Sequence, residues 1–168
     1  MQYWLMKSEP SEFSLDDLQR KGREPWDGVR NYQVRNWFRD QMRPQDLAFF
    51  YHSNCAVPGI VGVMEILTPA YPDPTAFEPD NPHYDPKSDP AQPRWYLVDV
   101  GYVAHFPRTV SLSELRTYPE LSELALLRRG NRLSVMPVAA AAWGFIMDLQ
   151  AGPALPSTPL RERANTVP

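Results

Sequence analysis

The sequence predicts an α+β fold, in which a small curved β-sheet or barrel is flanked by short helices. Five apolar segments have the length and residue types of strands. The helical segments between them do not alternate regularly with the strands, as they would around a parallel sheet. The chain has 168 residues, of which 43% are hydrophobic. That is enough for one domain with a core of its own.

The five expected strands are short runs of aliphatic and aromatic residues that end at polar or turn-forming residues. The first run ends at Lys7, and a turn that contains Asn54 and Pro58 joins the second run to the third. The five segments comprise residues 3–6, 46–52, 59–66, 95–103 and 133–136.

Four helices are expected from capping residues and from the spacing of apolar side chains. Ser14, followed by acidic residues, predicts the start of a short helix that stops at Gly22. Apolar side chains recur at helical spacing over residues 31–42. The segment Ser111–Glu114 has the capping-box pattern, and a final helix is expected over residues 139–149.

The stretch between the third and fourth strands is rich in proline and in acidic residues. Eight prolines fall between residues 69 and 93, and residues 65–100 carry a net charge of −5. Proline disfavours both helices and central strands, so this stretch is a long loop. Its aromatic residues predict an ordered flap that packs along the barrel, and its charge predicts that it lies away from the arginine-bearing surface. These aromatic residues are Tyr71, Phe77, Tyr84 and Trp95.

The domain is expected to cover residues 1–149, followed by a flexible proline-rich tail over residues 150–168. No run approaches the roughly 18 apolar residues that a membrane span requires, and the first residues lack the pattern of a secretory signal. The lone cysteine, Cys55, excludes an internal disulfide framework. We therefore expect a cytoplasmic monomer without a membrane partner, or a nuclear one if the source is a eukaryote.

The familiar motifs of cofactor and metal chemistry are missing from the sequence. The segment Gly59–Gly62 lacks the third glycine and the helix of a dinucleotide site. The three histidines are widely spaced and form no helical metal-binding pair, so no cofactor and no metal are expected. Cys55 lies near His52, but no third group is evident that would orient such a pair for catalysis.

Aromatic and polar side chains gather instead at the ends of the expected elements. Each cluster has an ordinary structural explanation, since Trp26 is a plausible core residue and the arginines are plausible solvated surface groups. Together, however, these residue types suit a nucleobase: a planar base stacks on Trp, Asn, Ser and Lys form hydrogen bonds with its edge, and arginines bind the flanking phosphates. The clusters are residues 7–9, 26–31, 52–54 and 128–132.

These strings resemble the EVE-domain family, which belongs to the PUA-like superfamily. The shared motifs span residues 1 to about 148 and occur at residues 3–10, 26–32, 50–54, 59–62, 70–77, 84–89, 93–95 and 128–134. The resemblance implies a compact PUA-like β-barrel of about five to six strands flanked by short helices. It also implies a pocket that binds modified nucleobases, with modified cytosines linked to the family.

A related domain of the same superfamily, the YTH domain, reads N6-methyladenine with an aromatic cage. Its pattern also begins with Lys-Ser at a strand end and continues with a loop Trp. By that similarity Lys7, Ser8 and Trp26 belong to the base pocket. Because Trp26 lies on a loop between Pro25 and Asp27, it is predicted to form a wall of the pocket and not to be a central core residue. The YTH loop then continues with Ser, whereas this chain has Asp27 and Gly28, so a preference for adenine is not carried over.

The leading hypothesis is therefore a non-catalytic reader of a modified base in DNA or RNA. The net charge of −3 argues against strong non-specific binding, although a local basic face is compatible with it. The base pocket is predicted to contain Lys7, Ser8, Trp26, Asn31, His52, Ser53, Arg129 and Asn131. The predicted phosphate contacts are Arg30, Arg35, Arg39, Arg128 and Arg132.

Two alternatives stay open at this point. One is an enzyme that acts on a nucleic-acid base or nucleotide, with His52 and Asp27 as its proton-transfer groups. The other is a small-molecule or protein-interaction module whose pocket only resembles a base site. The absence of a set of nucleophile, base and orienting group favours the reader over the enzyme.

Overall fold

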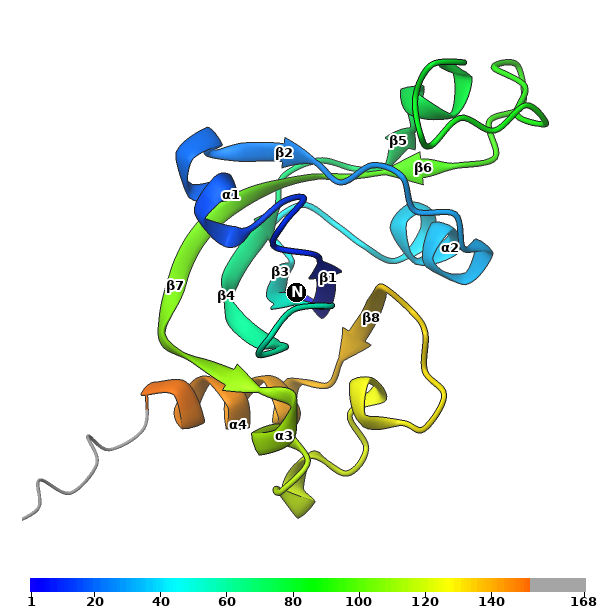
Figure 1. The fold of residues 1–168 in the computed structure, drawn as a ribbon. Coiled ribbons are helices and arrows are strands. Elements are labelled where there is room, and N and C mark those ends of the chain that lie inside the picture. The colour runs from blue at the N-terminus through cyan, green and yellow to red at the C-terminus, as the bar shows by residue number, and fades with distance from the viewer. Residues whose placement is uncertain (152–168) are drawn as a thin grey trace, which may run out of the picture.

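A single curled sheet of six strands organises the molecule, as the computed structural model of residues 1–151 shows (Figure 1). The predicted tail lies outside these described residues, apart from its first two positions. The strand order is β2-β7-β4-β3-β1-β8, and only the β1–β3 pair is parallel. The strands are β1 (Tyr3–Ser8), β2 (Arg23–Pro25), β3 (Leu47–His52), β4 (Gly59–Ile66), β7 (Asp99–Ser111) and β8 (Val135–Val138). The predicted α+β fold with a small curved sheet is confirmed.

Irregular pairing in the middle of the sheet accompanies its curl. The register shifts between Phe50 and Tyr51 where β3 pairs with β4, and it shifts twice where β4 pairs with β7. Such bulges bend the strand that carries them and increase its twist. Gly62 sits at this bend, where a Cβ atom would collide with the carbonyl of Ala104. The sheet is a half-barrel, because its edge strands β2 and β8 do not pair with each other.

Each face of the sheet carries its own hydrophobic core, because successive side chains of a strand point to opposite faces. In β1, Trp4 and Met6 belong to one cluster and Leu5 belongs to the other. Helices α1 (Leu15–Lys21) and α2 (Tyr32–Asp40) contribute buried side chains to the first cluster. The second receives α3 (Leu112–Leu115), α4 (Ala140–Ala151) and the 3-10 helices η2 (Pro119–Leu121) and η3 (Ala125–Leu127).

The expected helix caps are present. Ser14 Oγ accepts a hydrogen bond from the Asp17 backbone, and the Asp17 carboxylate accepts one from Ser14 N, which completes a capping box. Gly22 ends α1 with φ at +81°. Asn31 caps α2 through a hydrogen bond from Val34 N. Ser111 Oγ accepts a hydrogen bond from Glu114 N, but the Glu114 carboxylate pairs with Arg108, so only half of the predicted capping box forms there.

The proline-rich segment is ordered, as expected, but it lies on a different side from the one predicted. It contains a two-stranded sheet of β5 (Tyr71–Pro72) and β6 (Tyr96–Leu97) and the 3-10 helix η1 (Pro74–Phe77). Trp95 anchors the segment by donating its Nε1 hydrogen to Asp85 at 2.7 Å. The prediction that the acidic segment avoids the arginines is wrong, because Arg30 forms an ion pair with the buried Asp73.

Within residues 1–151, no helix combines the length and the apolar character needed to cross a bilayer. The same residues contain no cluster of three or more His, Cys, Asp or Glu side chains arranged to hold a metal ion.

Candidate functional site

A cavity of about 670 Å³ opens where several loops meet at one end of the sheet. The ends of β1 and β3 contribute to it, together with the loops that precede α1, α2 and β8 and one residue of the proline-rich segment. Its lining comprises residues 7–9, 12–13, 24–31, 53, 83 and 132–134. The volume falls within the usual range for ligand sites in proteins.

The parallel pairing of β1 with β3 brings the first two groups of the lining together. Parallel strands end at the same edge of a sheet, and here Ser8 is aligned with His52. Ser53 N donates to the carbonyl of Ser8 at 3.0 Å, which fixes Ser53 beside β1. On the other side, Lys7 N donates to the carbonyl of Ser134 at 2.7 Å. The backbone at the floor of the cavity is therefore held on both sides.

Trp26 forms one wall of the cavity and is also part of the core. Its side chain is only 8% exposed, and its ring meets Phe50 edge-on with centroids 5.6 Å apart. Its backbone N–H donates to the carbonyl of Val98 at 2.9 Å. Its position on a loop suggested a pocket wall that stays out of the core. The expectation that Trp26 stays out of the core is wrong, because β2 pairs with β7 and so holds the residue that follows it against the sheet.

The loop after Trp26 has a backbone conformation that glycine favours. Gly28 has φ at +80°, and a Cβ atom there would lie 2.5 Å from the imidazole ring of His83. Gly28 N donates to the Asp73 carboxylate at 2.8 Å. The loop ends at Asn31, whose side chain caps α2 and also lines the cavity.

Two ionisable groups in the cavity have pKa values displaced from their ordinary range. Partial burial raises the pKa of Asp27, and the nearby negative charge of Asp73 raises it further. Partial burial lowers the pKa of Lys7, whose Nζ lies 5.8 Å from the ring centroid of Tyr51. The cavity thus offers a carboxyl and an ammonium group that have both lost part of their hydration, and each can form hydrogen bonds with the edge of a planar ligand.

The cavity brings together seven of the thirteen residues that the sequence nominated. These are Lys7, Ser8, Trp26, Arg30, Asn31, Ser53 and Arg132. His52 is not part of the lining, because its Nε2 accepts a hydrogen bond from the backbone of Leu15 at 3.2 Å. Asn131 also lies elsewhere and stabilises its own loop by donating to the carbonyl of Ala125 at 2.6 Å.

Among the five arginines expected to contact phosphate, three are engaged by the protein itself. Arg30 pairs with Asp73 at 3.0 Å, and Arg39 pairs with Asp40 at 2.8 Å. Arg35 donates to the carbonyl of Arg94 at 3.3 Å, and its guanidinium lies 4.9 Å from the ring centroid of Tyr32.

The remaining arginines that the sequence nominated lie on the loop before β8. Arg128, Arg129 and Arg132 are exposed and form no ion pair with the described part of the chain. Arg132 lines the cavity, whereas Arg128 and Asn131 line a second, more apolar groove of about 880 Å³ on the other side of Leu133. Arg129 lines neither space.

Comparisons with protein families, with known sequences and with solved structures agree with one another. The sequence pattern of the EVE domain matches residues 2–149. This chain belongs to the EVE-domain family. Thymocyte nuclear protein 1 of Mus musculus is 46% identical over 167 residues, an alignment that covers 88% of this chain and 73% of the mouse protein. The human protein of the same name is 42% identical with the same coverage.

Several solved structures superpose closely on this one. A protein from Pseudomonas syringae is 49% identical, with a TM-score of 0.85 and coverage of 88% of this chain and 99% of that one. Human THYN1, solved in complex with DNA that contains 5-methylcytosine, is 41% identical, with a TM-score of 0.86 and coverage of 92% and 100%. A YTH domain from Zygosaccharomyces rouxii, with a TM-score of 0.50 and 13% identity, shares the fold alone.

Several lining residues of this EVE domain were not nominated from the sequence. His83 comes from the proline-rich segment, where only the aromatic residues were considered. Glu12 and Phe13 lie in the connection between β1 and α1. The sequence offered a signal for Phe13, which follows the Lys7-Ser8 motif closely. In the structure the carbonyl of Phe13 accepts a hydrogen bond from the Ser8 hydroxyl at 2.6 Å.

Proposed function

We propose that this EVE domain is a non-catalytic reader that binds a modified cytosine, in DNA, inside the cavity beside Trp26. The observation that carries the proposal is the composition of that cavity. A nearly buried tryptophan forms one wall, and the partly desolvated Asp27 and Lys7 line the same space. The relative solved with DNA containing 5-methylcytosine supports the choice of base and of nucleic acid.

The chemistry of the lining suits a base that carries an exocyclic amine, as cytosine does. A carboxylate accepts a hydrogen bond from the exocyclic amine of cytosine, and Asp27 supplies that acceptor. Stacking on an aromatic ring is worth about 1–3 kcal/mol per base and does not depend on the identity of the base. Thymine has no exocyclic amine, so Asp27 disfavours thymine, while Trp26 provides affinity for any base.

Selectivity for the methyl group requires a close apolar fit. One methyl group contributes about 1–3 kcal/mol in a fitted pocket, which is a factor of roughly 10 to 200 in affinity. Extracting the base from a duplex costs a few kcal/mol. We therefore expect weak binding that depends on the modification and that is tighter when the target base is mismatched or single-stranded.

The enzyme hypothesis loses its support in the cavity, because His52 does not share that space with Asp27. The predictions of a monomer and of a cytoplasmic site of action, nuclear in a eukaryote, are retained with the proposal. The name of the animal relatives, thymocyte nuclear protein 1, supports a nuclear location in eukaryotes.

Replacing Asp27 by Asn is expected to stabilise the free protein and to weaken cytosine binding. The raised pKa means that the folded state disfavours the charged carboxylate. The wild-type protein therefore loses stability as the pH rises from the unfolded value of about 3.9 through the higher folded value. Thermal unfolding from pH 3 to 8 measures this, and the stability advantage of Asp27→Asn should grow as the pH rises above about 4.

The matched control is Asp80→Asn, which removes an exposed carboxylate away from the cavity. It should change neither the pH profile nor DNA binding. An Asp27→Asn variant that binds methylated DNA as well as the wild type would remove Asp27 from the recognition site.

The loop before β8, which carries Arg128, Arg129 and Arg132, yields a prediction about the salt dependence of DNA binding. Each phosphate contact contributes about one unit to the slope of log K against log salt. Arg132→Ala should reduce that slope by about one unit and weaken binding to all sequences equally. Arg39→Ala serves as the control, since Arg39 already pairs with Asp40, and its slope should match the wild type. Equal slopes for all three proteins would exclude the loop before β8 from the DNA interface.

The experiment that tests the proposed function is a titration with matched oligonucleotides. Fluorescently labelled duplexes that differ only at one cytosine, either unmodified or 5-methylated, are titrated with the protein at fixed salt. Mass spectrometry of the recovered bases follows. The proposal expects tighter binding of the methylated duplex and unchanged bases. Equal affinities would refute a reader, and a new base or an abasic site would indicate an enzyme.

A further inference from the structure

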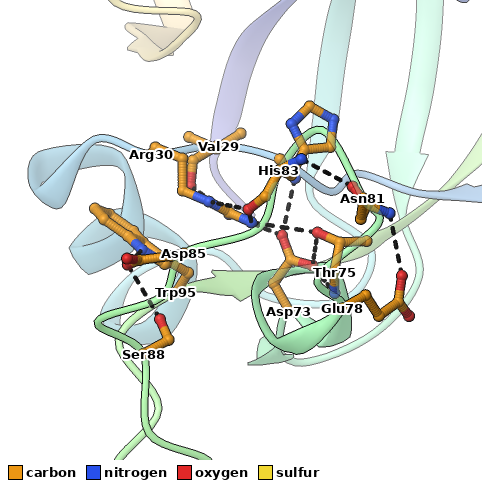
Figure 2. A network of polar contacts seen from close by, with 11 residues as sticks. Val29, Arg30, Asp73, Thr75, Glu78, Asn81, His83, Asp85, Ser88 and Trp95 are labelled. Carbon is orange, nitrogen blue, oxygen red and sulfur yellow. Dashed lines mark hydrogen bonds and ion pairs between the residues drawn. The ribbon is translucent and has the colours of Figure 1, made fainter.

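The carboxylate of Asp73 lies at the centre of a polar network that joins the proline-rich segment to the cavity loop (Figure 2). Its side chain is fully buried, and it accepts four hydrogen bonds. Two come from Thr75, at 2.9 Å from the backbone N and at 2.6 Å from Oγ1. The other two come from the cavity loop, at 2.8 Å from Gly28 N and at 3.0 Å from Arg30 Nη1.

Arg30 extends the same network to a second point of the proline-rich segment. Its Nη2 donates to the carbonyl of His83 at 2.7 Å and to Thr75 Oγ1 at 3.2 Å. Its guanidinium also lies 5.6 Å from the ring centroid of Trp95. Figure 2 shows the Arg30 guanidinium directed toward the Asp73 carboxylate and the carbonyl of His83.

The network also determines where the His83 ring lies. The ring packs directly against Gly28, and both residues line the cavity. Asn81 Oδ1 accepts a hydrogen bond from His83 N at 2.9 Å and fixes the backbone on the other side (Figure 2). The proline-rich segment therefore forms part of the wall, and the loop from Trp26 to Asn31 depends on it for its position.

We propose that Asp73 is the positioning residue of the base site. It holds the loop that carries Trp26 and Asp27 in the one conformation that fits a modified cytosine. The inference rests on the proposed function for its ligand, while the anchoring of the loop is a property of the free protein.

The role of Asp73 depends on the negative charge of its carboxylate as well as on its hydrogen bonds. Burial alone would raise the pKa of Asp73, but the hydrogen bonds from Thr75, Gly28 and Arg30 outweigh burial and hold its pKa below the usual value. The carboxylate is therefore charged at neutral pH and neutralises Arg30. Without that charge, the partly exposed guanidinium of Arg30 becomes available to DNA phosphates.

Asp73→Asn separates the positioning role from simple loss of the fold. The variant is almost isosteric but loses the charge and one acceptor. The preference for methylated over unmodified DNA should fall from the 10-fold or more that a fitted methyl group supports toward about 1. Affinity for unmodified DNA should stay the same or rise, because Arg30 is released. A merely destabilised protein would instead lose affinity for both duplexes together.

Hydrogen exchange provides a readout that does not depend on the ligand. In Asp73→Asn without DNA, the Gly28 amide should exchange faster than in the wild type, since its acceptor is weakened. The control is Asp85→Asn, which removes the carboxylate that holds Trp95 and Ser88 further along the same segment. It should speed exchange near residues 87–88 and leave residues 27–31 unchanged.

The two readouts distinguish the inference from the proposed function. Unchanged exchange at Gly28 in Asp73→Asn, or an unchanged preference for methylated DNA in a folded variant, overturns the positioning role. A wild-type protein without any preference overturns the proposed function, while faster exchange in the variant still supports the anchor. If Asp73→Asn does not fold, Thr75→Val removes two hydrogen bonds of the network and keeps the ion pair. It should show the same changes in milder form, and their absence would equally overturn the role.

Discussion

We expect Trp26→Ala to destabilise the protein and to weaken its binding of the modified base. Trp26 is 8% exposed and packs edge-on against Phe50 in the first core cluster. Truncation of a buried tryptophan to alanine typically costs about 3–5 kcal/mol. The lost stacking surface should cost a further 1–3 kcal/mol or so of binding free energy. Chemical denaturation and DNA titration measure the two effects separately.

Trp143→Ala is the matched control for this variant. Trp143 is 7% exposed and stacks on Phe49 with centroids 3.8 Å apart, in the cluster on the opposite face of the sheet. It should lose similar stability without losing the preference for methylated DNA. Trp26→Phe keeps much of the apolar volume and should stay folded while binding more weakly. A Trp26→Phe variant with undiminished affinity for methylated DNA would rule out stacking on this side chain.

The largest purely structural effect is expected for Asp46→Ala. The Asp46 side chain is 2% exposed, and its carboxylate accepts hydrogen bonds from Trp4 Nε1 at 3.0 Å, Gln2 N at 2.9 Å and Arg43 N at 2.9 Å. Its removal leaves the buried indole N–H of Trp4 without a partner. The expected loss is about 3–5 kcal/mol in the free energy of unfolding.

Asp40→Ala is the control for that substitution. Asp40 is exposed, and its carboxylate is paired with the exposed Arg39, so its removal should leave stability nearly unchanged. Comparable losses in both variants would show that the Asp46 hydrogen bonds do not hold the start of β1 against the turn that precedes β3.

The local sequence signals predict elements well where a strand or helix carries its own signature. The apolar run that became β4 keeps its predicted limits, Gly59–Ile66, and the cap at Ser14 begins its helix as expected. The three-residue strand β2 was missed because Arg23–Pro25 carries no apolar pattern. The predicted strand over residues 95–103 is wrong as one strand, because Tyr96–Leu97 form β6, which pairs with β5 in a separate sheet, and β7 begins at Asp99. Strand β7 then extends to Ser111, because its pairing with β4 stabilises exposed residues that have no strand signature.

Pairings between distant residues account for most of the differences at the site. Lys7, Ser8 and Trp26 were expected together from the similarity to the YTH domain, and the cavity unites them. The pairing of Arg30 with Asp73 joins positions 43 residues apart, and local sequence does not encode it. His52 ends β3 as expected, but its ring accepts a hydrogen bond from α1, and only the packed structure reveals that contact.

A crystal structure of the protein with a duplex that carries one 5-methylcytosine would show the base site itself. We expect the methylated base to leave the helix and enter the cavity, with its ring against Trp26 and its exocyclic amine within hydrogen-bonding distance of the Asp27 carboxylate. A base that stays stacked in the duplex, or that occupies the groove beside Arg128 and Asn131, would contradict the account.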